Sequence, residues 1–252
     1  MLSSRKRMLP LASVIAIALA TLPACAEVHE EFHKTVAIDA KGSFSLKNIN
    51  GGINISSWDR NEVQIDAVKT ASSTEKLRAA RIEIAGSGHS VDVQTKYPDH
   101  TNNNPASVEY TIHLPRGARL FGVETVNGNI HIDGPRGRIK AGTVNGKVEA
   151  WNAADELDLN SVNGEVKASL SNPGRNPVKL NVVNGSVSIS LASSANAHVK
   201  ASTVHGGIHS DFPLEVEKSQ YAPGATVDST LGSGGATIEL ESVNGSIYLH
   251  KN

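Results

Sequence analysis

Two pairs of histidines are the residues of this chain that could coordinate a metal ion. His29 and His33 are four residues apart, and so are His205 and His209. Histidine is a common zinc ligand. However, the first pair lies beside two glutamates in a polar segment, and the second flanks a Gly-Gly turn, which does not favour a shared metal geometry. We therefore expect no metal site, and the chain carries no motif that indicates a cofactor.

Carboxylates are the other residues that could do chemistry, because glycan hydrolysis needs two carboxyl groups facing one bond. In the repeats described below, equivalent positions are occupied by Glu149, Lys167 and Ser188. This mixed column is typical of a solvated surface, and we predict no catalytic residues. The alternative is a polysaccharide-acting enzyme, a lyase or hydrolase of the β-helix type.

The first 26 residues have the pattern of a signal peptide. A basic start at residues 5–7 precedes an apolar run from Leu11 to Leu22, which is too short to span a bilayer comfortably. Residues 24–26 read Ala-Cys-Ala, a cleavage site that leaves a single domain over residues 27–252. In the alternative, residues 22–25 form a lipoprotein box and Cys25, the only cysteine, is acylated.

Both alternatives place the protein outside the cytoplasm, in the periplasm or at the cell surface. The mature chain has no transmembrane span, so we expect membrane attachment only if Cys25 is lipidated. The whole chain has 24 basic and 25 acidic residues. Removal of the three basic residues of the signal leaves 21 basic residues, so the mature chain has a net charge of −4. Without a basic stripe and with 4% aromatic residues, the chain is not expected to bind nucleic acid. The expected partner is an envelope protein or a glycan.

A repeated Val-Asn-Gly triplet dominates the rest of the sequence. Successive valines from 126 to 204 are 18, 18, 21 and 21 residues apart, and the last gap is 39. A period near 20 residues indicates a repeat architecture. If the turns stack, the asparagines form a side-chain ladder. The ladder expected from the sequence comprises Asn50, Asn127, Asn145, Asn163, Asn184 and Asn244, with Gly51, Gly128, Gly146, Gly164, Gly185, Gly206 and Gly245.

Apolar residues alternate with polar ones on both sides of each triplet. They occupy the positions one, three and five before the valine, as in Phe121, Val123 and Thr125, where threonine takes the position nearest the triplet. After the triplet they occupy positions four and six, as in Ile130 and Ile132. This pattern predicts two half-buried strands per copy. The change of parity across Asn-Gly requires a sharp turn, which is either the corner of a β-solenoid or a two-residue hairpin.

We predict the solenoid, because a meander of hairpins would leave one apolar face bare and the sequence offers no helices to cover it. The alternative is a barrel or sandwich built from antiparallel hairpins. One short helix is expected over residues 73–84. A longer loop is expected at 218–224. The last strand, Ile247 to Lys251, is expected to be an exposed terminal strand.

Longer motifs give the chain a family resemblance. They are Val108-Glu-Tyr-Thr-Ile-His-Leu-Pro-Arg-Gly117, the tandem triplets, and the ending that begins at Gly234-Gly235-Ala236. Over residues 35–252 the chain resembles the bacterial β-strand-repeat proteins known as "putative adhesins", a domain of unknown function. The resemblance implies a β-helix-like stack at the cell envelope, and some relatives are linked to envelope-stress signalling. No catalytic residue is carried over, because the matched positions are turn and core positions. The function expected is that of an exported, non-enzymatic, adhesin-like binding protein or an accessory of the envelope-stress response.

Overall fold

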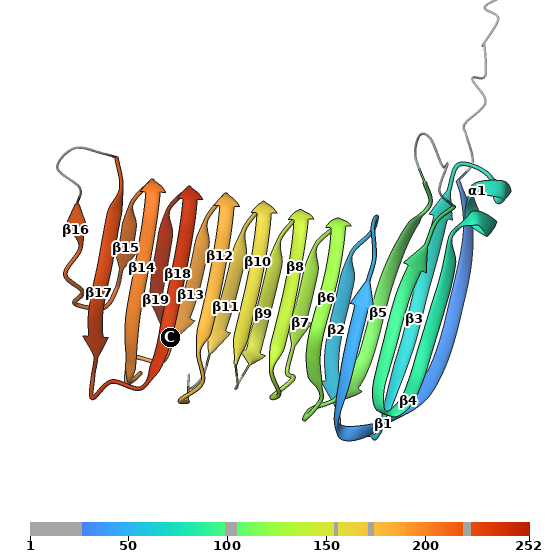
Figure 1. The fold of residues 1–252 in the computed structure, drawn as a ribbon, viewed down its shortest axis with the longest axis horizontal. Coiled ribbons are helices and arrows are strands. Elements are labelled where there is room, and N and C mark those ends of the chain that lie inside the picture. Colours follow the sequence, from blue (N-terminus) through green and yellow to red (C-terminus); the bar gives the residue numbers. More distant parts are fainter. Residues whose placement is uncertain (1–26, 99–104, 154–155, 171–173, 219–222) are drawn as a thin grey trace, which may run out of the picture.

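The protein is an elongated, two-sheet β-structure (Figure 1). The computed structural model describes residues 27–98, 105–153, 156–170, 174–218 and 223–252. It contains nineteen strands and one short helix among these residues. The predicted all-β class is confirmed. Within the described residues, no helix has the length and apolarity needed to cross a lipid bilayer.

The strands form two sheets that share β1, whose first part lies in sheet A and whose last part lies in sheet B. In spatial order, sheet A contains β1 (Val28–Lys47), β3 (Glu62–Ala71), β5 (Ser107–Pro115), β2 (Ile53–Trp58), β7 (Ile130–Asp133), β9 (Val148–Ala153), β11 (Val166–Leu170), β13 (Val187–Leu191), β19 (Ile247–Lys251) and β15 (Ile208–Ser210). Sheet B contains β4 (Arg81–Lys96), β1, β6 (Arg119–Asn127), β8 (Ile139–Asn145), β10 (Leu157–Asn163), β12 (Val178–Asn184), β18 (Ala236–Asn244), β14 (Ala197–His205), β17 (Ala225–Leu231) and β16 (Glu217–Lys218).

Each Val-Asn-Gly triplet is a corner between a strand of sheet B and the next strand, which lies in sheet A. We call such a pair of strands a coil. Equivalent strands of neighbouring coils pair in parallel, so that Asn163 lies opposite both Asn145 and Asn184. The strands on the two sides of a triplet belong to different sheets, so the triplets do not form antiparallel hairpins. The arrangement is therefore β-solenoid-like.

The coils are not stacked in sequence order. The spatial order is β4–β5, β1–β2, β6–β7, β8–β9, β10–β11, β12–β13, β18–β19 and β14–β15. The last strand, β19, pairs with β13 on one side and β15 on the other. The expectation of an exposed terminal strand is wrong, and Figure 1 shows the C-terminus inside the stack. Antiparallel β17 and β16 extend sheet B beyond β14 instead.

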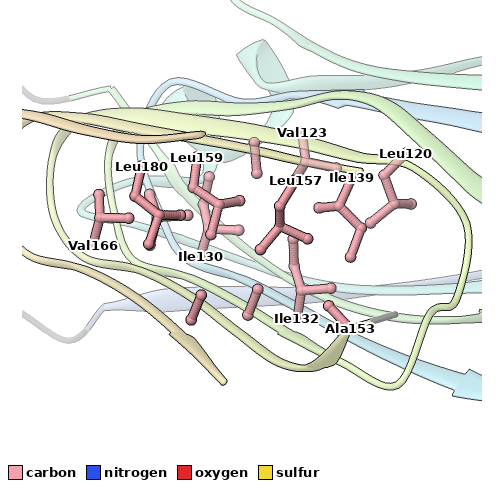
Figure 2. Close-up of a cluster of buried hydrophobic side chains, with 14 of the residues drawn as sticks. Leu120, Val123, Ile130, Ile132, Ile139, Ala153, Leu157, Leu159, Val166 and Leu180 are labelled. Carbon is pink, nitrogen blue, oxygen red and sulfur yellow. The ribbon is translucent and has the colours of Figure 1, made fainter. Parts of the chain in front are cut away.

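The core lies between the two sheets and consists of the alternating apolar residues (Figure 2). Leu157, Leu159 and Ile139 of sheet B face Ile130 and Ile132 of sheet A, and all five are at most 1% exposed. A continuous row of such residues in every coil removes apolar surface from water, which is the main favourable term in folding.

One residue of the expected core is on the surface. Phe121 is 47% exposed, and Leu120 is buried in its place. The register between β6 and β8 shifts between Leu120 and Val123. This bulge inserts an extra residue and turns Phe121 outward, where it lies under the guanidinium group of Arg119.

The helix is shorter than expected. α1 spans Thr74–Ala79, with the Ser73 side chain accepting a hydrogen bond from the Lys76 amide as N-cap. From Arg81 onward the chain is in strand β4. Ile82 and Ile84 alternate with charged residues there, and β-branched residues at period two favour a strand.

Candidate functional site

The corners form a continuous hydrogen-bonded ladder along one edge of the molecule. The side-chain amide of each ladder asparagine donates to the side-chain oxygen of the preceding one in the stack, at 2.8–3.0 Å. This series runs without a break through Asn50, Asn127, Asn145, Asn163, Asn184 and Asn244. Next to Asn244 lies His205, which replaces asparagine in the outermost coil. Because these bonds link every asparagine of the series to its neighbours in the stack, we propose a structural role for the ladder.

The glycines of the triplets permit the coils to approach closely at the corner. A Cβ atom on Gly164 would lie 1.8 Å from the carbonyl oxygen of Gly146. The amide of Gly164 donates to the carbonyl oxygen of Asn184 at 3.0 Å. No other residue type fits such a contact without moving the backbone. Gly206, in the outermost coil, makes the same close approach to Gly245.

The residue before each valine is buried beneath the corner, and in most coils it is serine or threonine. Its hydroxyl donates to the glycine carbonyl oxygen of the preceding coil, as in Thr143 to Gly128 at 3.0 Å and Ser161 to Gly146 at 2.9 Å. The hydroxyl therefore satisfies a carbonyl group that the corner removes from water. We call this series the hydroxyl row; in spatial order it comprises Asn48, Thr125, Thr143, Ser161, Val182, Ser242 and Thr203.

The valine of each triplet points outward and is exposed. The side chains are 37–50% exposed, although valine is among the residue types most often buried. We call this series the valine row; in spatial order it comprises Ile49, Val126, Val144, Val162, Val183, Val243 and Val204. Our sequence interpretation overlooked this row. The signal was present in the parity, since residues one, three and five before the valine face inward and the valine itself must face outward.

A groove of about 730 Å³ runs beside the valine row across the outer face of sheet B. Its centre is lined by short side chains two residues before each valine, among them Gly142, Asn160 and Asn181. Lys47 and Glu241 lie in the same row near its opposite ends, and Glu124 lies beside Lys47. We call this series the central row; in spatial order it comprises Gln94, Lys47, Glu124, Gly142, Asn160, Asn181, Glu241 and Ser202.

A row of alternating charges borders the groove on the side away from the valines. Lys140 lies 3.9 Å from Asp158, and Lys179 lies 2.8 Å from Glu239. The hydrogen bond and charge of Glu239 raise the pKa of Lys179. We call this series the charged row; in spatial order its charged members are Asp92, Lys140, Asp158, Lys179, Glu239 and Lys200.

The other residues singled out in the sequence are not brought together. His33 contacts Asp66, and His29 contacts Thr70 at 2.9 Å. Partial burial opposes ionisation of Asp66, but hydrogen bonds from His33 and Gln64 outweigh it and lower the pKa of that carboxyl group. No group of three or more metal-ligating side chains occurs in the parts of the chain that the structure describes.

At the other end, His209 stacks on Tyr248 with ring centroids 5.2 Å apart. Glu149, Lys167 and Ser188 do lie side by side on the outer face of sheet A, as the repeat register requires. Lys167 pairs with Glu165 at 2.9 Å. Cys25 and the signal segment, residues 1–26, lie outside the described residues.

Known proteins match the chain at the level of fold. The sequence profile of the family described as Toastrack DUF4097 matches residues 35–250. A solved structure from Clostridium sporogenes, described as a "putative cell adhesion protein", is 14% identical, with a TM-score of 0.50; the match covers 88% of this chain and 100% of that one. Another from Bacteroides fragilis, described as a "putative adhesin", is also 14% identical, with a TM-score of 0.40 over 88% of this chain and 97% of that one. No curated protein matches the chain at a significant level.

Proposed function

Because this chain belongs to the Toastrack DUF4097 family and exposes a long apolar row, we propose that it is an exported, non-enzymatic, adhesin-like binding protein of the cell envelope. Residues 1–26 act as a signal peptide, and the domain over residues 27–252 is the binding unit. It binds a protein or a glycan in the periplasm or at the cell surface, on its own or as an accessory of the envelope-stress response. Acylation of Cys25 would tether it to the membrane.

The single observation that carries this proposal is the valine row beside the groove. Contiguous exposed apolar surface rimmed by polar residues marks interaction sites. Folding does not account for the row, because the side chains of Val144, Val162 and Val183 are 39–41% exposed and lie outside the core. A rigid, corner-locked scaffold also holds the row straight, so little conformational entropy is lost on binding.

The chemistry of the groove favours binding over glycan hydrolysis. Its two carboxylates, Glu124 and Glu241, belong to coils four positions apart, which corresponds to about 19 Å at the usual strand spacing. Hydrolysis requires carboxyl groups separated by roughly 5–9.5 Å. The groove therefore lacks a suitably spaced pair among its own lining residues.

A second candidate function rests on a smaller hollow at the end of sheet B. Glu239 and Glu241 are two residues apart on β18 there, with Glu217, Asp228 and Lys200 around them. This is where a polysaccharide-acting enzyme would have its carboxylates. However, Lys179 already holds Glu239 at 2.8 Å. Release of reducing sugar or unsaturated product from envelope glycans that is lost in Glu241→Gln would favour this alternative over the binding proposal.

The binding proposal is tested with labelled protein added to envelope fractions of its host. Val162→Lys should weaken saturable binding by at least about tenfold, because it places a charge in the middle of the apolar row. Val68→Lys is the matched control, since Val68 is 42% exposed on β3, away from the groove. Equal binding by wild type, Val162→Lys and Val68→Lys would show that the groove is not the binding surface.

A further inference from the structure

We infer that the partner bound by the groove is a second copy of this chain, packed sheet B against sheet B. This inference rests on the proposed function, because it assigns the occupant of the same surface. In the proposed dimer the two-fold axis runs parallel to the strands and passes between β8 and β10. The two solenoids are therefore antiparallel, and each outer row of one copy faces the same row of the other in reversed coil order.

Reversal of the coil order brings opposite charges of the two central rows together. Lys47, on β1, falls opposite Glu241, on β18, of the second copy, and the symmetry makes this pair twice. Both side chains are exposed, and neither has an ion-pair partner within 4 Å among the residues that the structure describes. Between them, the missing side chain of Gly142 leaves room for Asn160 of the second copy. Opposite charges near the two ends of one row give an isologous interface two complementary pairs.

The same two-fold axis also brings opposite charges of the two charged rows together. Lys140 falls opposite Asp158 of the second copy, and Lys200 falls opposite Asp92. No two like charges meet in this register. The pairing of Lys200 with Asp92 does not follow from the ion pairs between neighbouring strands of one chain, because these two residues lie at opposite ends of sheet B, on β14 and β4.

Neighbouring registers are excluded by like charges. Sliding one copy by one coil in one direction places Lys140 opposite its own equivalent. Sliding it the other way places Glu124 opposite Glu241 and Lys140 opposite Lys179. Like charges held together in an interface are strongly unfavourable, so the charge pattern disfavours a shift by one coil in either direction.

The valine rows meet along the edge of this interface that lies next to the corners. Val144 falls opposite Val162 of the second copy, Val126 opposite Val183, and Ile49 opposite Val243. Eight strands at about 4.8 Å and five residues at about 3.3 Å give a footprint of roughly 630 Å² per copy. The total of roughly 1,300 Å² is close to the lower limit for a specific interface. We therefore expect a reversible dimer.

Sedimentation velocity of the exported chain over a concentration series tests the inference. Wild type should shift from monomer to dimer. Lys47→Glu and Glu241→Lys should each weaken association at least about tenfold, and the double charge swap should restore it to within about threefold of wild type. Val162→Lys should abolish association, and Val68→Lys should leave it unchanged. Melting curves at low concentration check that each variant is folded.

Several outcomes would overturn the inference, and they differ from those that overturn the proposed function. A wild-type chain that stays monomeric at millimolar concentration refutes the dimer, and so does a double swap that fails to restore association lost in both folded single variants. If wild type is monomeric but Val162→Lys loses envelope binding, the groove has another occupant and the proposed function stands. If charge-swap rescue succeeds but the envelope binding assay shows no effect of Val162→Lys, the dimer stands and the proposed function fails.

Discussion

The hydroxyl row and the valine row occupy adjacent positions in every coil that has a triplet corner, and in all of them except the β12 coil their polarity is the reverse of what burial usually selects. The polar residues are inside: Thr143 and Ser161 are at most 5% exposed. The apolar residues are outside: Val144 and Val162 are 39–40% exposed. Two residues joined by one peptide bond therefore follow opposite rules at the same corner.

Only the buried row has a role in folding that the structure accounts for. The buried hydroxyls are explained by the glycine carbonyl groups that they satisfy, because an unpaired buried carbonyl is costly. The exposed valines satisfy nothing within the chain. Since a surface position without a folding role tolerates most residue types, the regular recurrence of valine there is better explained by contact with a partner.

The largest expected effect comes from breaking the corner that both rows share. Gly164→Ala should cost several kcal/mol of unfolding free energy, roughly 3–5 kcal/mol, because the new Cβ would lie 1.8 Å from a backbone oxygen. Gly142→Ala is the matched control, since its Cβ would meet nothing closer than 3.5 Å. Thermal and urea unfolding of both variants measure the difference. Equal stabilities would contradict the close-packed corner.

A smaller loss is expected from removing one hydroxyl of the inner row. Thr143→Val keeps the shape of the side chain but leaves the Gly128 carbonyl oxygen without the donor that it has at 3.0 Å. The expected cost is about 1–3 kcal/mol, as for other buried groups that lose a partner. Urea unfolding measures it, and the control is Val144→Thr on the adjacent outer position, expected to stay within about 0.5 kcal/mol. A neutral Thr143→Val would mean that the hydroxyl row does not stabilise the corners.

Sequence reasoning recovered the local structure because the information was local. The alternation around each triplet determines which residues face inward, and Leu157 and Leu159 are buried as expected. It failed at Phe121, where a bulge adds one residue and reverses the parity. A single inserted residue changes the facing of a side chain but leaves the apolar count of the segment almost unchanged, so the pattern could not reveal it.

The order of the coils and the site were not recovered, for two different reasons. β18 and β19 enter the stack between β12–β13 and β14–β15, and any coil with the same corner could occupy that place. Strand pairing across tens of residues depends on tertiary contacts that no local motif encodes. The valine row was visible in the parity, but its significance depends on the neighbouring coils lying side by side, which only the structure provides.

The smallest expected effect is a gain at the β12 coil, the one coil in which an apolar residue occupies the hydroxyl row. Val182 occupies the hydroxyl row of β12 and is 4% exposed. A Cβ on Gly185 would lie 1.7 Å from the Gly164 oxygen and 3.3 Å from Val182, so the valine sits where the other coils place a donor. Val182→Thr should therefore supply a hydrogen bond to the Gly164 carbonyl oxygen. Against the cost of burying a hydroxyl, we expect a net stabilisation of about 0.5–1 kcal/mol.

The same substitution at the next residue tests the outer row. Val183→Thr changes an exposed valine, and its effect on unfolding free energy should be within about 0.5 kcal/mol. Both variants are compared by urea unfolding at low protein concentration, so that self-association does not add to stability. In contrast, Val183→Thr should weaken binding through the valine row, and Val182→Thr should leave it unchanged. A destabilised Val182→Thr would show that valine at this corner is selected for packing, and that the hydroxyl row is not continuous in its role.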